Sequence, residues 1–171
     1  MKKFFCFLGI VSIIAIFLSG SFEVKDQCIR IHVRANSNTT IDQTVKYEVK
    51  DEIVKYLTPY VSDATSFCDA LGSVEKRLAD IEKIADGVLK SNGFYYGAKA
   101  RLCQEKFPAR TYQGYTLKEG VYEALIIELG EGVGDNWWCV LFPPLCFSPQ
   151  GKGDTIEYRS KIAELCEKIF G

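Results

Sequence analysis

The chain has 171 residues, of which 47% are hydrophobic and 25% are charged, a balance typical of a globular protein and not of a disordered one. Its formal net charge of −1 excludes the strongly basic surface of a nucleic-acid-binding protein. Setting Lys2 and Lys3 aside leaves 19 basic residues against 22 acidic ones, so a polybasic patch for anionic lipid is not expected either.

The N-terminus has the pattern of a secretory signal peptide. Lys2 and Lys3 precede an uncharged run, Phe4–Leu18, which small residues follow. As a helix this run would span about 22 Å, less than the roughly 30 Å hydrocarbon layer of a membrane. We therefore expect residues 1–21 to direct export, either cleaved off or kept as an anchor, and residues 22–171 to form a single globular domain.

Residue periodicity predicts a strand and then helices in the first half of the domain. Apolar and polar residues alternate from Cys28 to Ala35, which predicts a half-buried strand. A helix is expected from Thr40, whose spacing to Gln43 is that of a capping box, and Pro59 should end it. A longer helix should run from about Ser66 to Lys90. The expected buried stripes are Ile41, Val45, Val49, Ile53 and Leu57 in the first helix and Phe67, Leu71, Val74, Leu78, Ile81, Ala85 and Val88 in the second.

The second half changes to strands. Tyr96–Lys106, Thr111–Thr116 and Tyr122–Leu129 have strand character, and a glycine-containing turn predicts a hairpin between the last two. Apolar spacing from about Thr155 predicts a short C-terminal helix. The order predicts a single α+β domain, with a mostly antiparallel sheet of about four strands, two long helices on one face and a short C-terminal helix.

Six cysteines follow the predicted signal, namely Cys28, Cys68, Cys103, Cys139, Cys146 and Cys166. An even number in an exported chain permits disulfides, and 15 pairings are possible. No Cys-x-x-Cys pair occurs, and His32 is the only histidine, so the usual zinc spacings are absent. We expect no metal and no cofactor.

The segment 130–147 holds both tryptophans, three glycines at alternate positions and a Pro-Pro pair. The glycines do not predict a phosphate loop, because no helix can begin directly after them. A bond between Cys139 and Cys146 would brace the segment and present its aromatic residues on a rigid knob. This segment is either a lid on the core or a recognition surface.

The same segment resembles the signature of the stage II sporulation protein R family. The matching run is Gly-Glu-Gly-x-Gly-x-Asn-Trp-Trp-Cys-Val-Leu-Phe-Pro-Pro-Leu-Cys-Phe, residues 130–147. The stretch Arg30–Ser37, followed by Asp42, Gln43 and Lys46, is similar to the N-terminal motif of that family. Shorter similarities lie at 110–112 and 122–124. Asn38 stands where the family pattern leads us to expect aspartate.

The resemblance implies a secreted signal of endospore formation. Such a protein would be exported from the forespore into the space between two membranes and would activate the membrane-embedded aspartic protease that processes pro-sigma-E. It would be a binding protein without a small-molecule substrate. The candidate contacts for the protease are Trp137, Trp138, Phe142, Pro143, Pro144 and Phe147, with Arg30, Arg34 and Asn36 as secondary candidates.

The alternatives are a cell-wall-binding module and a peptidoglycan hydrolase. A hydrolase would need paired carboxylates, and Glu131 and Asp135 lie near the tryptophans in sequence. Glu123 and Glu128 differ by an odd number of positions, which places them on opposite faces of a regular strand. A Cys-His pair would need His32, which falls between two arginines on the polar side of its strand. We therefore expect no enzyme activity.

Overall fold

In the computed structural model, which describes residues 27–112 and 115–145, a four-stranded sheet has the order β2-β5-β1-β6. The strands are β1 (Ile29–Arg34), β2 (Ala98–Phe107), β5 (Gly120–Leu129) and β6 (Asn136–Phe142). β5 pairs antiparallel with β2 and parallel with β1, and β1 pairs antiparallel with β6. The predicted α+β domain with a mostly antiparallel sheet is confirmed.

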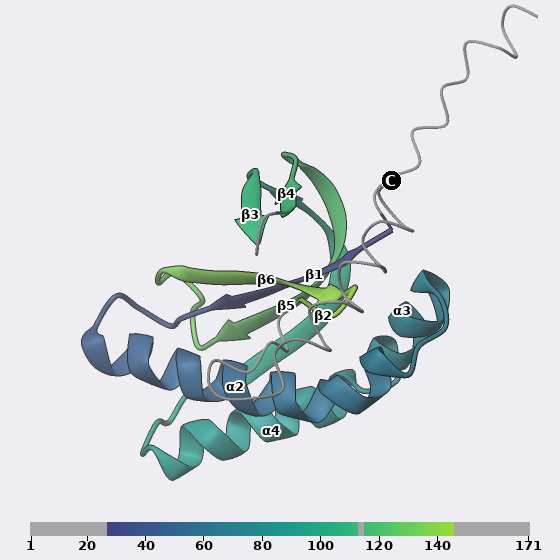
Figure 1. The fold of residues 1–171 in the computed structure, drawn as a ribbon. Coiled ribbons are helices and arrows are strands. Elements are labelled where there is room, and N and C mark those ends of the chain that lie inside the picture. Colours follow the sequence, from purple (N-terminus) through teal and green to yellow (C-terminus); the bar gives the residue numbers. More distant parts are fainter. Residues whose placement is uncertain (1–26, 113–114, 146–171) are drawn as a thin grey trace, which may run out of the picture.

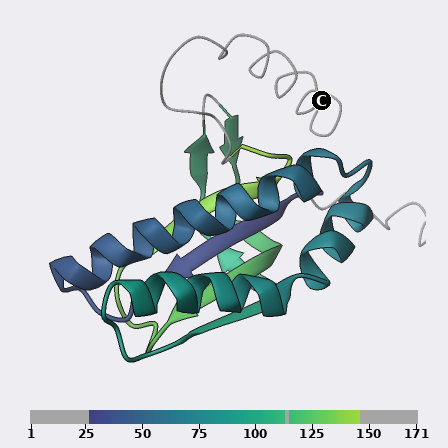
Figure 2. The same cartoon turned by 90° about the horizontal axis from the view of Figure 1, so that it is seen from below.

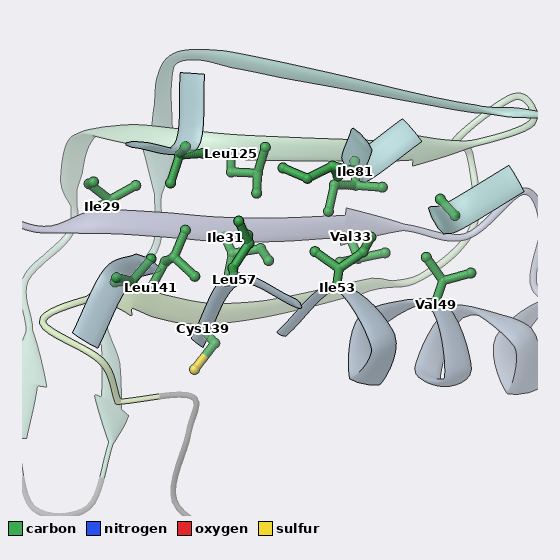
Figure 3. Close-up of a cluster of buried hydrophobic side chains, with 14 of the residues drawn as sticks. Ile29, Ile31, Val33, Val49, Ile53, Leu57, Ile81, Leu125, Cys139 and Leu141 are labelled. Atoms are coloured by element: carbon green, nitrogen blue, oxygen red, sulfur yellow. The ribbon is translucent and has the colours of Figure 1, made fainter. Parts of the chain in front are cut away.

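Three helices cover one face of this sheet: α2 (Thr40–Ser62), α3 (Phe67–Glu75) and α4 (Leu78–Ser91). Figure 2, which views the molecule from the helical side, shows α2 and α4 lying side by side in front of the strands. Their apolar stripes meet Ile31, Val33, Leu125 and Ile127 of the sheet in one buried cluster, part of which is drawn in Figure 3. This cluster is the main core, and it explains the periodic apolar residues of both halves of the chain.

A second buried cluster lies on the opposite face. A separate two-stranded sheet, β3 (Arg110–Tyr112) with β4 (Tyr115–Leu117), projects on that side (Figure 1). Leu117 and Tyr112 of this β3–β4 hairpin pack with Phe107, Tyr122, Ala124, Ile126, Val140 and Leu145. The face of β1 that carries Arg30, His32 and Arg34 is therefore partly covered, although its alternation predicts a polar face.

Several sequence predictions of element bounds were wrong. Pro59 lies inside the last turn of α2, and the helix closes beyond it through a bond from the Asp63 amide to the Pro59 carbonyl. The single helix expected over 66–90 is broken at Lys76 and Arg77. The guanidinium of Arg77 caps a carbonyl of α3 and lies 3.4 Å from the ring centre of Tyr60, which holds this bend against α2.

Two further corrections concern strands and the start of a helix. The Thr111–Thr116 strand is in fact the β3–β4 hairpin, so the expected hairpin with Tyr122–Leu129 does not form. The N-cap of α2 is Thr39, not Thr40, and Thr39 accepts a bond from the amide of Asp42. Ile41, expected in the core, is 69% exposed, because Asp42 and not Ile41 lies on the buried side of the first turn of α2.

None of the helices within the described ranges is long and apolar enough to cross a bilayer. The predicted signal peptide, the C-terminal helix, Phe147 and the cysteines at 146 and 166 lie outside these ranges.

Candidate functional site

The turn between β1 and α2 is built around the carboxylate of Asp42, which is 5% exposed. This carboxylate accepts bonds from the Ser37 hydroxyl (2.5 Å), the Asn36 amide (3.0 Å) and the Tyr96 hydroxyl (2.5 Å). Burial by itself would raise the pKa of Asp42, but these bonds outweigh it and hold the pKa below its usual value. Burial and the Asp42 charge raise the pKa of Tyr96. Asp42 is therefore an ionised structural acceptor.

The same turn binds the loop between β5 and β6. The amide oxygen of Asn36 accepts from the backbone of Glu131 (3.0 Å), and that of Asn38 accepts from the backbone of Asp135 (2.6 Å). Lys46, only 1% exposed, donates to the Asp135 carbonyl (3.0 Å), although its place off the apolar stripe predicts exposure. We call this set the turn lock; its members are Asn36, Ser37, Asn38, Asp42, Gln43, Lys46 and Tyr96 with residues 130–135.

The alternate glycines of segment 130–134 belong to the turn lock. Gly130 has φ +58, and a Cβ there would lie 2.2 Å from the Asn36 amide oxygen. A Cβ on Gly134 would lie 2.3 Å from the backbone oxygen of Ser37, and the Gly134 amide donates to Ala35. These glycines are needed for close approach of two backbones. They lead into strand β6 and not into a helix, which agrees with the rejection of a phosphate loop.

Arg30 lies on the second sheet face and is fully buried. Its guanidinium carbon lies 4.4 Å from the ring centre of Phe107, 5.2 Å from that of Tyr122 and 5.5 Å from that of Tyr112. It also donates to the Tyr112 hydroxyl (2.8 Å) and the Cys139 carbonyl (3.3 Å). We call this set the Arg30 cage. It attaches the β3–β4 hairpin to β1 through cation–π contacts and a hydrogen bond.

A row of ionisable groups continues from the cage toward the turn lock. Nδ1 of His32 lies 2.9 Å from Glu105, which also accepts from Arg34 at 2.9 Å. Arg34 donates to Glu128 (2.7 Å), which also pairs with Arg101 (2.5 Å). The hydrogen bond from Arg101 is the largest influence that lowers the pKa of Glu128. The row is charge-balanced, which is typical of a structural network.

His32 is 3% exposed and lies between the rings of Phe107 and Trp138. Its burial and its Arg34 neighbour lower its pKa below 6.5, although Asn136 and Glu105 act in the opposite direction. The native state therefore holds a neutral imidazole, whereas the unfolded chain takes up a proton near pH 6.5. Because the unfolded state binds more protons below that pH, acidification favours unfolding.

We therefore expect the urea midpoint of unfolding to fall when the pH is lowered from 7.5 to 5.5. The fall should be smaller in His32→Gln, which removes the titrating group but keeps a polar side chain. This window lies above the usual titration range of carboxylates, so the difference between the two proteins reports His32. An identical pH dependence of wild type and variant would show that His32 does not contribute.

The candidate contact residues of the aromatic segment do not form one exposed knob. They lie in and directly after strand β6, a strand that the sequence analysis did not predict. Trp137 packs against the main core and Trp138 against the second cluster, and both side chains are half-buried. Phe142 is 6% exposed and Pro143 is buried, while Pro144 is half-buried. Phe142 and Pro143 cannot make a broad direct contact with a partner in this conformation, and the same holds for Arg30.

The remaining candidates keep some exposed surface. Arg34 and Asn36 are half-buried, and Trp138 lies under the guanidinium of Arg110, 4.8 Å from the ring centre. Lys50 lies 5.3 Å from the ring centre of Trp137 on the other face. Two tryptophans on opposite faces of the sheet do not make a joint platform for a sugar ring.

The cysteine predictions are resolved only in part. Cys68 and Cys103 carry free thiols, so neither belongs to a disulfide. Cys139 is 7% exposed and is not among the free thiols of the described residues. Its expected partner, Cys146, lies outside those residues, and the 139–146 bridge stays a prediction.

The described residues do not assemble the proposed catalytic groups. Glu131 and Asp135 are exposed, and their backbone groups are used in the turn lock. Glu123 belongs to the helix-side face and bonds Gln104, whereas Glu128 lies on the other face with Arg34, as their spacing predicts. Within residues 27–112 and 115–145 no cluster of potential metal ligands occurs.

Sequence reasoning missed most of the supporting residues. Tyr96, Glu105 and Phe107 carry no local signal, because their roles depend on partners more than 50 positions away. Asp42 and Lys46 were found only through the motif that contains them. The structure brings the separate motif stretches together. The end of the stretch 30–37 contacts the loop 130–135 in the turn lock. Tyr112 from the stretch 110–112 and Tyr122 from the stretch 122–124 both contact Arg30.

The fold and the two clusters, the turn lock and the Arg30 cage, define a class of protein. It is an α+β domain in which buried polar side chains join loops and strands that are distant in sequence. Residues 25–152 match the profile of the family described as stage II sporulation protein R. The chain is also 36% identical over 134 residues to the stage II sporulation protein R of Bacillus subtilis (strain 168), an alignment that covers 78% of this chain. The chain belongs to the stage II sporulation protein R family.

The alignment spans 60% of the length of that curated relative. No solved structure matches the chain.

Proposed function

We propose that this protein is an exported signal of endospore formation that activates the membrane-embedded protease processing pro-sigma-E. Family membership is the observation that carries the proposal. The signal-peptide pattern of residues 1–21 supports export to the space between forespore and mother cell. A signal of this kind needs only a surface whose affinity differs between the inactive and active states of the protease.

We further propose that the protease contacts the sheet face beside the β3–β4 hairpin, through Trp138, Arg34 and Asn36. Tryptophan and arginine contribute strongly to protein interfaces. Arg30, Phe142 and Pro143 would support this surface from below, and a Cys139–Cys146 bridge would brace its end. Pro144 remains a candidate at its border, whereas Trp137 lies on the opposite face of the sheet and stays a separate candidate.

Co-expression in a non-sporulating host tests the function. The protease and pro-sigma-E are produced with and without the full chain, and processing is followed by immunoblot. We expect mature sigma factor only when the chain is present. Absence of processing, with folded protein recovered outside the cytoplasm, would contradict the proposal. Hydrolysis of purified peptidoglycan, or sedimentation with cell walls, would favour the enzyme or the wall-binding module instead.

Trp138→Ala tests the proposed contact surface in the same assay. We expect most of the processing to be lost while the variant keeps a cooperative unfolding transition. Tyr95→Ala is the matched control, because Tyr95 is a fully exposed aromatic residue outside this surface. Normal processing with Trp138→Ala would show that the protease does not contact this face of the sheet. The proposed function would still stand.

A further inference from the structure

Strand β2 forms one border of the sheet, and α4 covers only the first part of its outer edge. The backbone amide of Ala98 donates to the Asp86 carboxylate of α4 (2.8 Å), and that of Ala100 donates to the Glu82 carboxylate (2.8 Å). Both amides therefore point away from β5, which pairs with the other side of β2. The two carboxylates occupy the backbone positions through which another strand would otherwise pair.

The rest of this outer edge is open. β2 pairs with β5 along its whole length without a register shift, so its backbone groups alternate regularly between the two sides. The amides and carbonyls of Leu102, Gln104 and Lys106 therefore point to the same side as the two capped amides. Within residues 27–112 and 115–145 these outer backbone groups have no hydrogen-bond partner. Pro108, which follows β2 and has no amide hydrogen, ends the open stretch 102–106.

The backbone chemistry of the open stretch selects an extended strand as its partner. Amides and carbonyls at strand spacing are satisfied by a second strand with the same spacing. The open stretch is also symmetric about Gln104, with one outward residue on each side. Two antiparallel copies of it would place Gln104 opposite Gln104, and Leu102 opposite Lys106, with about six hydrogen bonds between them. No pair of like charges lies directly opposite in this arrangement.

We propose that the open stretch pairs with the same stretch of a second copy of this chain, so that two four-stranded sheets join into one. A contact of this kind uses both open edges at once, and assembly therefore stops at two copies. Strand β6, which carries Trp138, lies at the far border of each sheet and stays uncovered. The dimer goes beyond the proposed function and does not depend on it.

The two ends of the open stretch fix the register of the pairing. A shift toward the start of β2 would oppose Lys106 with Ala100, where the Glu82 carboxylate already holds the amide. A shift the other way would oppose Leu102 with Pro108, which cannot donate. Either shift leaves the pair at each end incomplete, so the pairing centred on Gln104 is favoured. Because the contact is short, we expect a dissociation constant of roughly 10–100 µM.

Disulfide trapping tests both the contact and its register. Gln104→Cys would place the two new thiols on a hydrogen-bonded pair, with Cα atoms about 5.5 Å apart, which a disulfide can span. Lys106→Cys is the matched control, because Lys106 is also exposed on the helix-side face of β2, but its two copies would lie about 14 Å apart. Mild oxidation of the full chain at about 100 µM should link most of the Gln104→Cys protein into dimers and little of the control. Equal yields of the two dimers would overturn the proposal.

Analytical ultracentrifugation measures the association without a cross-link. We expect the mean mass of the full chain to rise toward twice the monomer mass between about 5 and 500 µM. Gln104→Pro removes the central outward amide, which β5 does not use, and should weaken association at least about tenfold. Gln104→Ala keeps that amide and should change association less than about threefold. A wild-type monomer over the whole range, or equal association of the two variants, would overturn the proposal.

Discussion

Asp42→Ala is expected to lower the free energy of unfolding by about 3 kcal/mol, because it removes a buried charged acceptor of several hydrogen bonds. Asn36, Ser37 and Tyr96 would each lose this partner inside a part-buried turn. Urea unfolding followed by tryptophan fluorescence measures the change. The turn lock would open at its α2 side, and the contacts from Asn36 to the 130–135 loop would weaken with it.

Asp69→Ala is the matched control for this variant. Asp69 occupies the equivalent position in α3, since its amide bonds the N-cap Ser66 as the Asp42 amide bonds Thr39. Among the described residues its exposed carboxylate accepts only from Thr65 in the same turn, so we expect a loss of about 1 kcal/mol or less. Equal losses in the two variants would show that Asp42 acts only as an ordinary first-turn carboxylate and does not hold the turn lock together.

Gly134→Ala is the second substitution with a large expected effect. The new Cβ would lie 2.3 Å from the Ser37 carbonyl oxygen and 3.0 Å from Cβ of Ala35, both in the β1–α2 segment. Because two backbones must separate to admit it, the bond from the Gly134 amide to Ala35 breaks as well. We expect a loss of about 3 kcal/mol, measured by the same urea titration.

Gly72→Ala, in α3, is the control for this glycine substitution. It adds the same methyl group where nothing lies within 4 Å, and alanine favours a helix, so stability should rise by up to about 1 kcal/mol. A Gly134→Ala protein as stable as the wild type would mean that the two loops are not held in contact.

Strands and helices could be predicted from residue periodicity where one face of the element is buried and the other is exposed. The alternation of β1 and the stripe of α2 follow this rule, apart from Ile41 at the end of the helix. Strand β6 was missed because Trp138–Phe142 is nearly continuous in apolar residues, as expected for a strand packed on both faces. The pairing of β6 with β1 depends on the strand order of the whole sheet, in which β1 lies between β5 and β6.

The candidate site was less predictable, because its chemistry depends on contacts between distant residues. Arg30, His32 and Lys46 were expected on polar faces, since charged side chains are normally solvated. The structure buries them, because Tyr112 of the β3–β4 hairpin packs over Arg30 and the rings of Phe107 and Trp138 flank His32. The 130–135 loop covers Lys46. The resemblance identified the relevant stretches, but no local pattern indicates that they meet.

The central claim is that the residues of the turn lock hold the β1–α2 turn and the 130–135 loop together as one unit. Amide hydrogen exchange measures this directly, because the amides of Glu131 and Asp135 donate to the side chains of Asn36 and Asn38. We expect both amides to be protected in the wild type and to lose protection together in Asp42→Ala. The amide of Ala100, which donates to Glu82 elsewhere, should stay protected. Unchanged protection of Glu131 and Asp135 in Asp42→Ala would contradict the claim.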